Sequence, residues 1–163
     1  MIVVADTSPV NYLVVIGKIH LLPQLYPIIV IPPAVVEELK QPSAPEKVRA
    51  FISNPPDWLM VKTPSLPPDS RLADLDKGER DALALALQMK ADLVLVDERD
   101  AHLVAKQCGL AIAGTLRVLA TAANKNLVDL SHAFALLRAT NFRADPKLFE
   151  VLLLQDAARR ENQ

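Results

Sequence analysis

Short apolar runs alternate along the chain with longer stretches that have helical patterns. The clearest runs, rich in Ile, Val and Leu, lie at residues 2–5, 28–31 and 93–96. Continuous runs of this kind are typical of parallel strands that are covered on both faces. Weaker strand signals lie at residues 59–62 and 111–113.

The stretches between these runs predict helices. Their apolar spacing, flanking Pro and Gly residues and Ala and Leu content place the helices at residues 9–16, 21–25, 33–40, 45–53, 78–91, 99–109, 115–125, 131–140 and 146–160. Strands that alternate with helices predict an α/β fold with a central parallel sheet.

The length of 163 residues indicates a single domain, 1–163, large enough for a sizeable core. Residues 53–77 are rich in Pro, and we expect them to wrap the surface instead of separating two domains. Residues 131–163 are expected to form a C-terminal helical extension. Its last helix carries Phe149, Leu152 and Leu153, which favour a packing helix over a surface for a dimer or for another protein.

The composition and the net charge of the chain limit the classes of protein to which it can belong. The chain has 51% hydrophobic residues, 23% charged residues and one cysteine, which together indicate a globular protein of a reducing compartment. No export signal or membrane-spanning segment is recognisable, so we expect a cytoplasmic protein without a membrane partner. The net charge of −1 provides no global attraction for nucleic acid, and any such binding must use a local basic patch.

Acidic residues stand where an α/β sheet gathers its ligands. Asp6 directly follows the first apolar run and Asp97 the third, and the carboxyl ends of parallel strands meet at one edge. Glu38 lies on the helix that begins at Pro33, and Glu79 opens the helix at 78–91. Each also has an ordinary structural explanation: helix capping for the two Asp residues, a solvated helix face for Glu38, and a favourable helix dipole for Glu79.

Taken together, these four carboxylates point to a bound cation. Two bare carboxylates ~4 Å apart repel by about 4 kcal/mol at an effective dielectric of 20, and a divalent cation would neutralise them. Carboxylates without His or Cys select Mg²⁺ or Mn²⁺, and His20, His102 and His132 are scattered without ligand spacing. Such a metal suits phosphodiester hydrolysis, because it lowers the pKa of water and stabilises charge on the leaving oxygen.

Four segments resemble the acidic motifs of the PIN-domain family, in particular of the VapC-type toxin ribonucleases of toxin–antitoxin pairs. They are "VVADTSP", "VIPPAVVEEL", "LDKGERDALALALQ" and "LVLVDERDA", and "GLAIAGTLRVLATAANKNLV" resembles a stretch of one subgroup. The resemblance implies that the catalytic residues and metal ligands are Asp6, Glu38 (in preference to Glu37), Glu79 and Asp97. It adds Asp100 as a further metal ligand and Asp81 as an alternative or supplement to Glu79.

The resemblance also implies a three-layer α/β/α sandwich and an Mg²⁺- or Mn²⁺-dependent endoribonuclease that acts on RNA. A homodimer and a small antitoxin are the partners it implies. The residues expected to contact substrate are Thr7, Ser8, Arg80, Arg99 and Thr115. The alternative is a non-catalytic PIN-like module that binds RNA or protein. Binding is favoured over catalysis if the four carboxylates do not converge within one coordination sphere in the structure.

Overall fold

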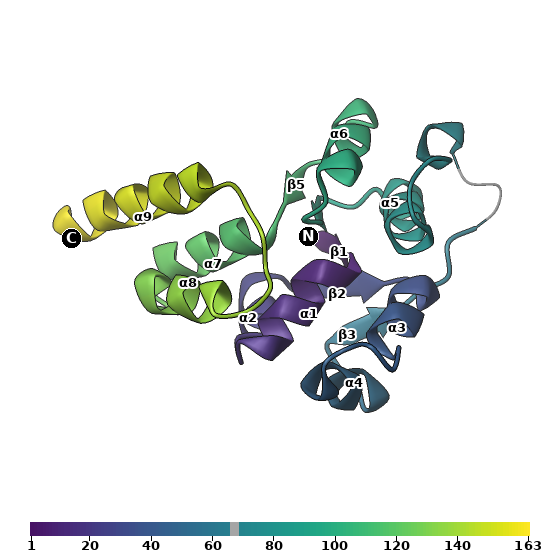
Figure 1. Cartoon of the computed structure of the whole chain (residues 1–163). Helices are drawn as coiled ribbons and strands as arrows, with labels where there is room; N and C mark the ends of the chain where they lie inside the picture. The colour runs from purple at the N-terminus through teal and green to yellow at the C-terminus, as the bar shows by residue number, and fades with distance from the viewer. Residues whose placement is uncertain (66–68) are drawn as a thin grey trace.

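A computed structural model describes residues 1–65 and 69–163 of the chain. The strands in these residues form one parallel sheet in the order β3-β2-β1-β4-β5 (Figure 1). Their bounds are β1 (Ile2–Ala5), β2 (Ile28–Ile31), β3 (Leu59–Val61), β4 (Leu93–Leu95) and β5 (Ile112–Ala113). The α/β fold with a central parallel sheet, predicted from the alternation of apolar runs and helices, is confirmed.

Helices cover both faces of this sheet. They are α1 (Thr7–Val15), α2 (Leu21–Leu25), α3 (Pro33–Leu39), α4 (Glu46–Ser53), α5 (Lys77–Met89), α6 (Arg99–Gln107), α7 (Thr115–Asn124), α8 (Leu130–Arg138) and α9 (Pro146–Glu161). Figure 1 shows α5 and α6 on one side of the sheet, with α1, α7 and α8 on the other. The result is the three-layer sandwich that the sequence motifs implied.

The middle strand β1 explains why the strand signals are uninterrupted apolar runs. Val3 packs into a core with α1, α7 and α8, whereas Val4 packs into a second core with α5 and α6. Both side chains are fully buried, because helices cover both faces of the sheet at β1, which lies between β2 and β4. Successive residues of a strand point to opposite faces, so a strand covered on both faces has no polar positions.

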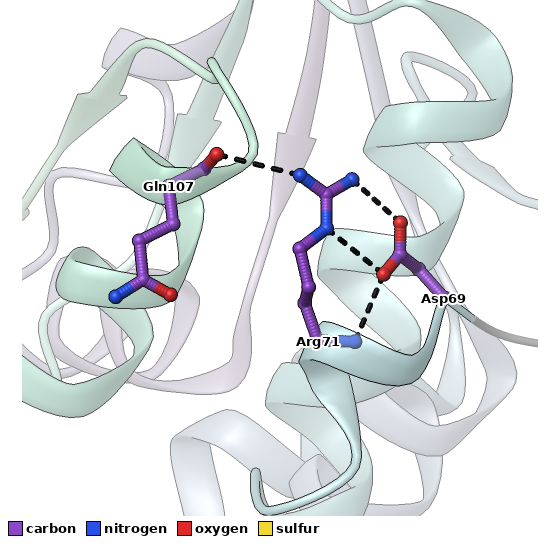
Figure 2. A network of polar contacts seen from close by, with 3 residues as sticks. All are labelled: Asp69, Arg71 and Gln107. Carbon is purple, nitrogen blue, oxygen red and sulfur yellow. Dashed lines mark hydrogen bonds and ion pairs between the residues drawn. The ribbon is translucent and has the colours of Figure 1, made fainter.

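The Pro-rich stretch 53–77 contains β3 and a 3-10 turn, η1 (Ser70–Leu72). Residues 66–68 of this stretch lie outside the described residues. Gln88 of α5 binds both backbone groups of Ser65, at 2.6 and 2.7 Å. Figure 2 shows how Arg71 fixes η1: its guanidinium donates to Asp69 and to the backbone carbonyl of Gln107 at the end of α6.

The C-terminal helices α8 and α9 pack on α7 and share its core. Phe149 and Leu152 of α9 are buried, and the Phe149 ring meets Phe134 of α8 in a T-shaped contact at 5.1 Å. Val151 and Leu154 lie on the opposite side of α9 and are exposed. Within the described residues, none of the helices has the length and apolar character needed to cross a bilayer.

Candidate active site

Asp6 stands at the carboxyl end of β1, in the middle of the sheet. Its backbone N–H donates to the carbonyl of Leu95 at 2.9 Å, which continues the pairing of β1 with β4. Only 3% of the residue is exposed. Asp6 occupies the N-cap position of α1, but its side chain makes no capping hydrogen bond, and Oδ1 is buried without a partner among the described residues. Helix capping therefore does not account for this carboxylate.

A cavity of about 460 Å³ opens beside Asp6. It is lined by Asp6, Thr7, Ser8, Asn11, Tyr12, Glu38, Asp76, Glu79 and Glu98. Every charged side chain in this lining is acidic. Three of the four carboxylates predicted from the sequence, Asp6, Glu38 and Glu79, thus face one cavity. Sequence reasoning missed Asp76 and Glu98, although Asp76 lies in the same motif as Glu79, as the N-cap of α5, and Glu98 directly follows Asp97.

The Glu38 carboxylate on α3 is bound by the hydroxyl of Thr7 and fits into space left by Gly78, which has no side chain. Thr7 Oγ1 donates a 2.6 Å hydrogen bond to Glu38 Oε2. The other oxygen, Oε1, lies against Gly78 in the first turn of α5, where a Cβ would stand only 2.1 Å away. Glycine is unfavourable inside a helix by roughly 1 kcal/mol relative to alanine. At position 78 it lets the Glu38 carboxylate pass close to the helix backbone.

Burial and the crowding of negative charge raise the pKa of two carboxyl groups in the cavity. Burial raises the pKa of Asp6 to about 7, the backbone N–H of Thr7 opposes the shift, and the charges of Glu38, Glu79 and Asp97 add to it. Burial also raises the pKa of Glu79 to about 7, with further contributions from Asp76, Glu98 and Glu38. A bound cation favours the charged form of a carboxylate and would reverse both shifts.

Asp97 has a different role from the other three carboxylates. It does not line the cavity, and its oxygens accept hydrogen bonds from Ser8 Oγ at 2.8 Å and from the N–H and hydroxyl of Thr115, both at 2.7 Å. A Cβ on Gly114 would lie 2.7 Å from Asp97 Oδ1. Asp97 therefore joins the start of α1 to the start of α7. It does not cap α6, which begins at Arg99 with Glu98 as N-cap.

Of the residues predicted to contact substrate, Thr7 and Ser8 line the cavity, whereas the other predicted residues lie outside its lining. Asp100 is exposed in the first turn of α6, and Arg99 before it is exposed as well. Asp81 pairs with Lys77 at 3.0 Å, and Arg80 Nε lies 3.8 Å from Asp81. Thr115 is fully buried, and both of its donors are used on Asp97.

The donor set fits a hard divalent cation. In the described ranges 1–65 and 69–163, no three His, Cys, Asp or Glu side chains are gathered closely enough to hold a metal ion by themselves. Mg²⁺ is usually held by only one or two carboxylates and keeps several waters, so it does not need three converging side chains. The buried, unpartnered Oδ1 of Asp6 and the oxygen-only lining both match that chemistry.

Comparison with known proteins identifies the family of the chain and a structure of similar fold. Residues 2–157 match the family described as PIN domain, and the chain belongs to that family. PIN domains are generally nucleases that use divalent metal ions. The fold is similar to that of a PilT N-terminus domain protein from the hyperthermophilic archaeon Sulfolobus solfataricus P2. That structure has a TM-score of 0.52 and 17% identity, and the alignment covers 74% of this chain and 92% of the other. Among curated proteins, none matches significantly.

Proposed function

We propose that the protein is an Mg²⁺- or Mn²⁺-dependent endoribonuclease that hydrolyses phosphodiester bonds of RNA. The observation that carries this proposal is Asp6: it is buried, its Oδ1 has no hydrogen-bond partner among the described residues, and it faces a cavity shared with Glu38 and Glu79. An apolar or capping role would leave this desolvated charge uncompensated. Asp6, Glu38 and Glu79 could hold a cation, which would supply the compensation.

Each side chain has a defined part in this mechanism. Asp6 and Glu38 would hold the ion directly, with Thr7 fixing the Glu38 carboxylate. Glu79 is half-buried at the cavity wall, where its carboxylate would take a proton from the attacking water as the general base. When bound, the ion supplies charge neutralisation at the phosphate and at the leaving oxygen. Asp97 acts through Ser8 and Thr115, which it keeps in place.

The biological role we propose is that of the toxin in a toxin–antitoxin pair, acting as a homodimer and restrained by a small antitoxin. This finer assignment is supported by the resemblance of the four acidic motifs to VapC-type ribonucleases. The exposed Val151 and Leu154 on the outer side of α9 offer an apolar surface for such a partner. Arg80, Arg99 and Asp100 lie outside the cavity lining, and any role in RNA or metal binding would be at its rim.

A second candidate function is a non-catalytic PIN-like module that binds RNA or protein. One observation favours it: in the described part of the chain, the four predicted carboxylates do not converge in one coordination sphere. The two functions make different predictions for the acidic cavity. A nuclease requires Asp6 for turnover, whereas a binding module tolerates its neutralisation.

RNA cleavage by purified protein separates these functions. A fluorescently labelled single-stranded RNA is incubated with Mg²⁺ or Mn²⁺ and with wild type, Asp6→Asn or Asp57→Asn. Asp57→Asn is the matched control, because Asp57 is exposed and lies outside the cavity lining. We expect cleavage by wild type and Asp57→Asn, none by Asp6→Asn, and none in the presence of EDTA. Equal cleavage by all three proteins would reveal a contaminating nuclease, and equal inactivity would favour the binding module.

A further inference from the structure

The acidic cavity has an aromatic wall that the carboxylate chemistry does not use. Tyr12 of α1 lines the cavity next to Asn11. The Tyr12 hydroxyl donates to Asn141 Oδ1 at 2.9 Å, and its ring meets Phe142 in a T-shaped contact at 5.0 Å. Asn141 and Phe142 belong to the segment between α8 and α9, which Figure 1 shows running beside α1. The C-terminal part of the chain thus reaches the rim of the candidate active site.

The Tyr12 ring is fixed from behind by a row of aromatic side chains. Phe142 is buried and packs edge to face on Phe149 at 6.4 Å, and Phe149 packs in the same way on Phe134 at 5.1 Å. Aromatic pairs of this geometry add stabilisation beyond their buried area. With its hydroxyl bound to Asn141 as well, Tyr12 is held in one orientation, and a preorganised ring loses little freedom when a ligand binds.

The segment between α8 and α9 also carries a positively charged side chain, Arg143. Arg143 directly follows Phe142, whose ring contacts Tyr12. Burial raises the pKa of Tyr12, the charges of Asp97 and Glu98 raise it further, and the guanidinium of Arg143 lowers it. Arg143 Nη1 donates to the carbonyl of Phe142 at 3.3 Å. Among the described residues no carboxylate pairs with Arg143, whereas Lys77 beside Glu79 is engaged by Asp81.

We propose that Tyr12 and Arg143 form a nucleotide subsite at the rim of the cavity, in which a base of single-stranded RNA stacks on the Tyr12 ring and the neighbouring phosphate pairs with Arg143. This subsite rests on the proposed function in one respect, namely that RNA is the ligand. An aromatic ring beside an Arg is the combination by which proteins hold unstacked single-stranded bases and their phosphates.

The experiment measures binding without cleavage. All proteins carry Asp6→Asn, and fluorescence anisotropy follows a labelled single-stranded RNA or a probe of equal length with abasic central nucleotides, both with Mg²⁺. The variants are Tyr12→Leu, Tyr12→Phe and Arg143→Gln. Lys47→Gln on the exposed surface of α4 is the matched control for the loss of one positive charge.

We expect Tyr12→Leu to weaken binding of the normal RNA about tenfold and to leave binding of the abasic probe unchanged, because stacking needs a base. Tyr12→Phe keeps the ring and is expected to retain most of the affinity. Arg143→Gln should reduce the slope of log Kd against log salt by about 0.7, the value for one phosphate contact on a single strand, and Lys47→Gln should not.

Equal loss on both probes would overturn the proposal, since Tyr12 would then only hold the segment between α8 and α9. Absence of RNA binding, or binding that is indifferent to Tyr12 and Arg143, would overturn it too. The proposed function fails separately. If RNA binding depends on Tyr12 and on the base but wild type shows no metal-dependent cleavage, the nuclease is refuted and the subsite is kept. If wild type cleaves RNA but RNA binding does not depend on Tyr12, the nuclease is kept and the subsite is refuted.

Discussion

Gly78 and Glu38 are in such close contact that a single added methyl group would displace a carboxylate of the candidate active site. A Cβ on Gly78 would lie 2.1 Å from Oε1 and 2.8 Å from Cδ of Glu38. The Glu38 carboxylate cannot yield freely, because its other oxygen is bound to Thr7 at 2.6 Å. The absence of a side chain at Gly78, in the first turn of α5, therefore allows the Glu38 carboxylate to keep its position.

The Gly78→Ala variant is expected to stay folded and to lose RNA cleavage by about 10- to 100-fold, the usual cost of displacing a group that orients a metal ligand. Alanine favours the helix over glycine, so the free energy of unfolding should change little. Because Thr7→Val acts through the same carboxylate, the losses in the double variant should not add. Additive losses, or full activity of Gly78→Ala, would contradict the role given to Glu38.

Glu37 and Glu38 form a matched pair on α3. Glu37 is exposed and Glu38 lines the cavity. We expect Glu38→Gln to abolish most of the metal-dependent cleavage and Glu37→Gln to leave it within about twofold, since exposed substitutions away from a site are usually near neutral. Cleavage rates of both variants at saturating Mg²⁺ test this. A greater loss in Glu37→Gln would reverse the assignment.

The buried Asp6 predicts a dependence of stability on pH. Its pKa is about 7 in the folded protein and near 3.8 when unfolded, so ionisation penalises the folded state. The penalty is absent below about pH 4, grows as the pH rises towards 7, and is complete above it. In EDTA, Asp6→Asn should thus be more stable than wild type at pH 8, by up to about 4 kcal/mol. The difference should vanish near pH 4.

Urea unfolding between pH 4 and 8 measures this difference directly. Asp57→Asn serves as the control, because that residue is exposed. If Asp6→Asn proved less stable than wild type at pH 8, Asp6 would be making a favourable capping interaction, and the argument for a desolvated ligand would be wrong.

Asp97 is predicted to be a structural connection as well as a functional one. Asp97→Ala leaves the buried N–H and hydroxyl of Thr115 without an acceptor, at a cost of about 1–3 kcal/mol for an unsatisfied group. Asp100→Ala removes an exposed carboxylate and should change the unfolding free energy by less than about 0.5 kcal/mol. The reverse order of destabilisation in urea would contradict the hydrogen-bond assignment.

The sheet could be predicted from the sequence because each strand has a local pattern of its own, a short run of apolar residues. The runs at 2–5 and 28–31 coincide with β1 and β2, since a strand buried on both faces must be apolar throughout. The helix expected at 9–16 begins earlier, at Thr7. Pro9 lies within the first turn of α1, where its missing N–H is not needed, so it does not mark the start of the helix.

The site was predictable in part. Asp6, Glu38 and Glu79 line one cavity, as their positions after strands and on the following helices suggested. The environment of Asp97 was not predictable, because its partner Ser8 is 89 residues away in the sequence. The same holds for Tyr12, whose partner Asn141 is 129 residues away. Local patterns do not contain such contacts, which depend on how helices pack across the finished sheet.

Titration calorimetry with Mn²⁺ and Mg²⁺ tests the central claim most directly, namely that the carboxylates around Asp6 hold a divalent cation. We predict saturable binding to wild type at millimolar concentration or below, weaker or absent binding to Asp6→Asn and Glu38→Gln, and unchanged binding to Glu37→Gln. Absence of uptake by wild type, or equal uptake by wild type and Asp6→Asn, would contradict the claim.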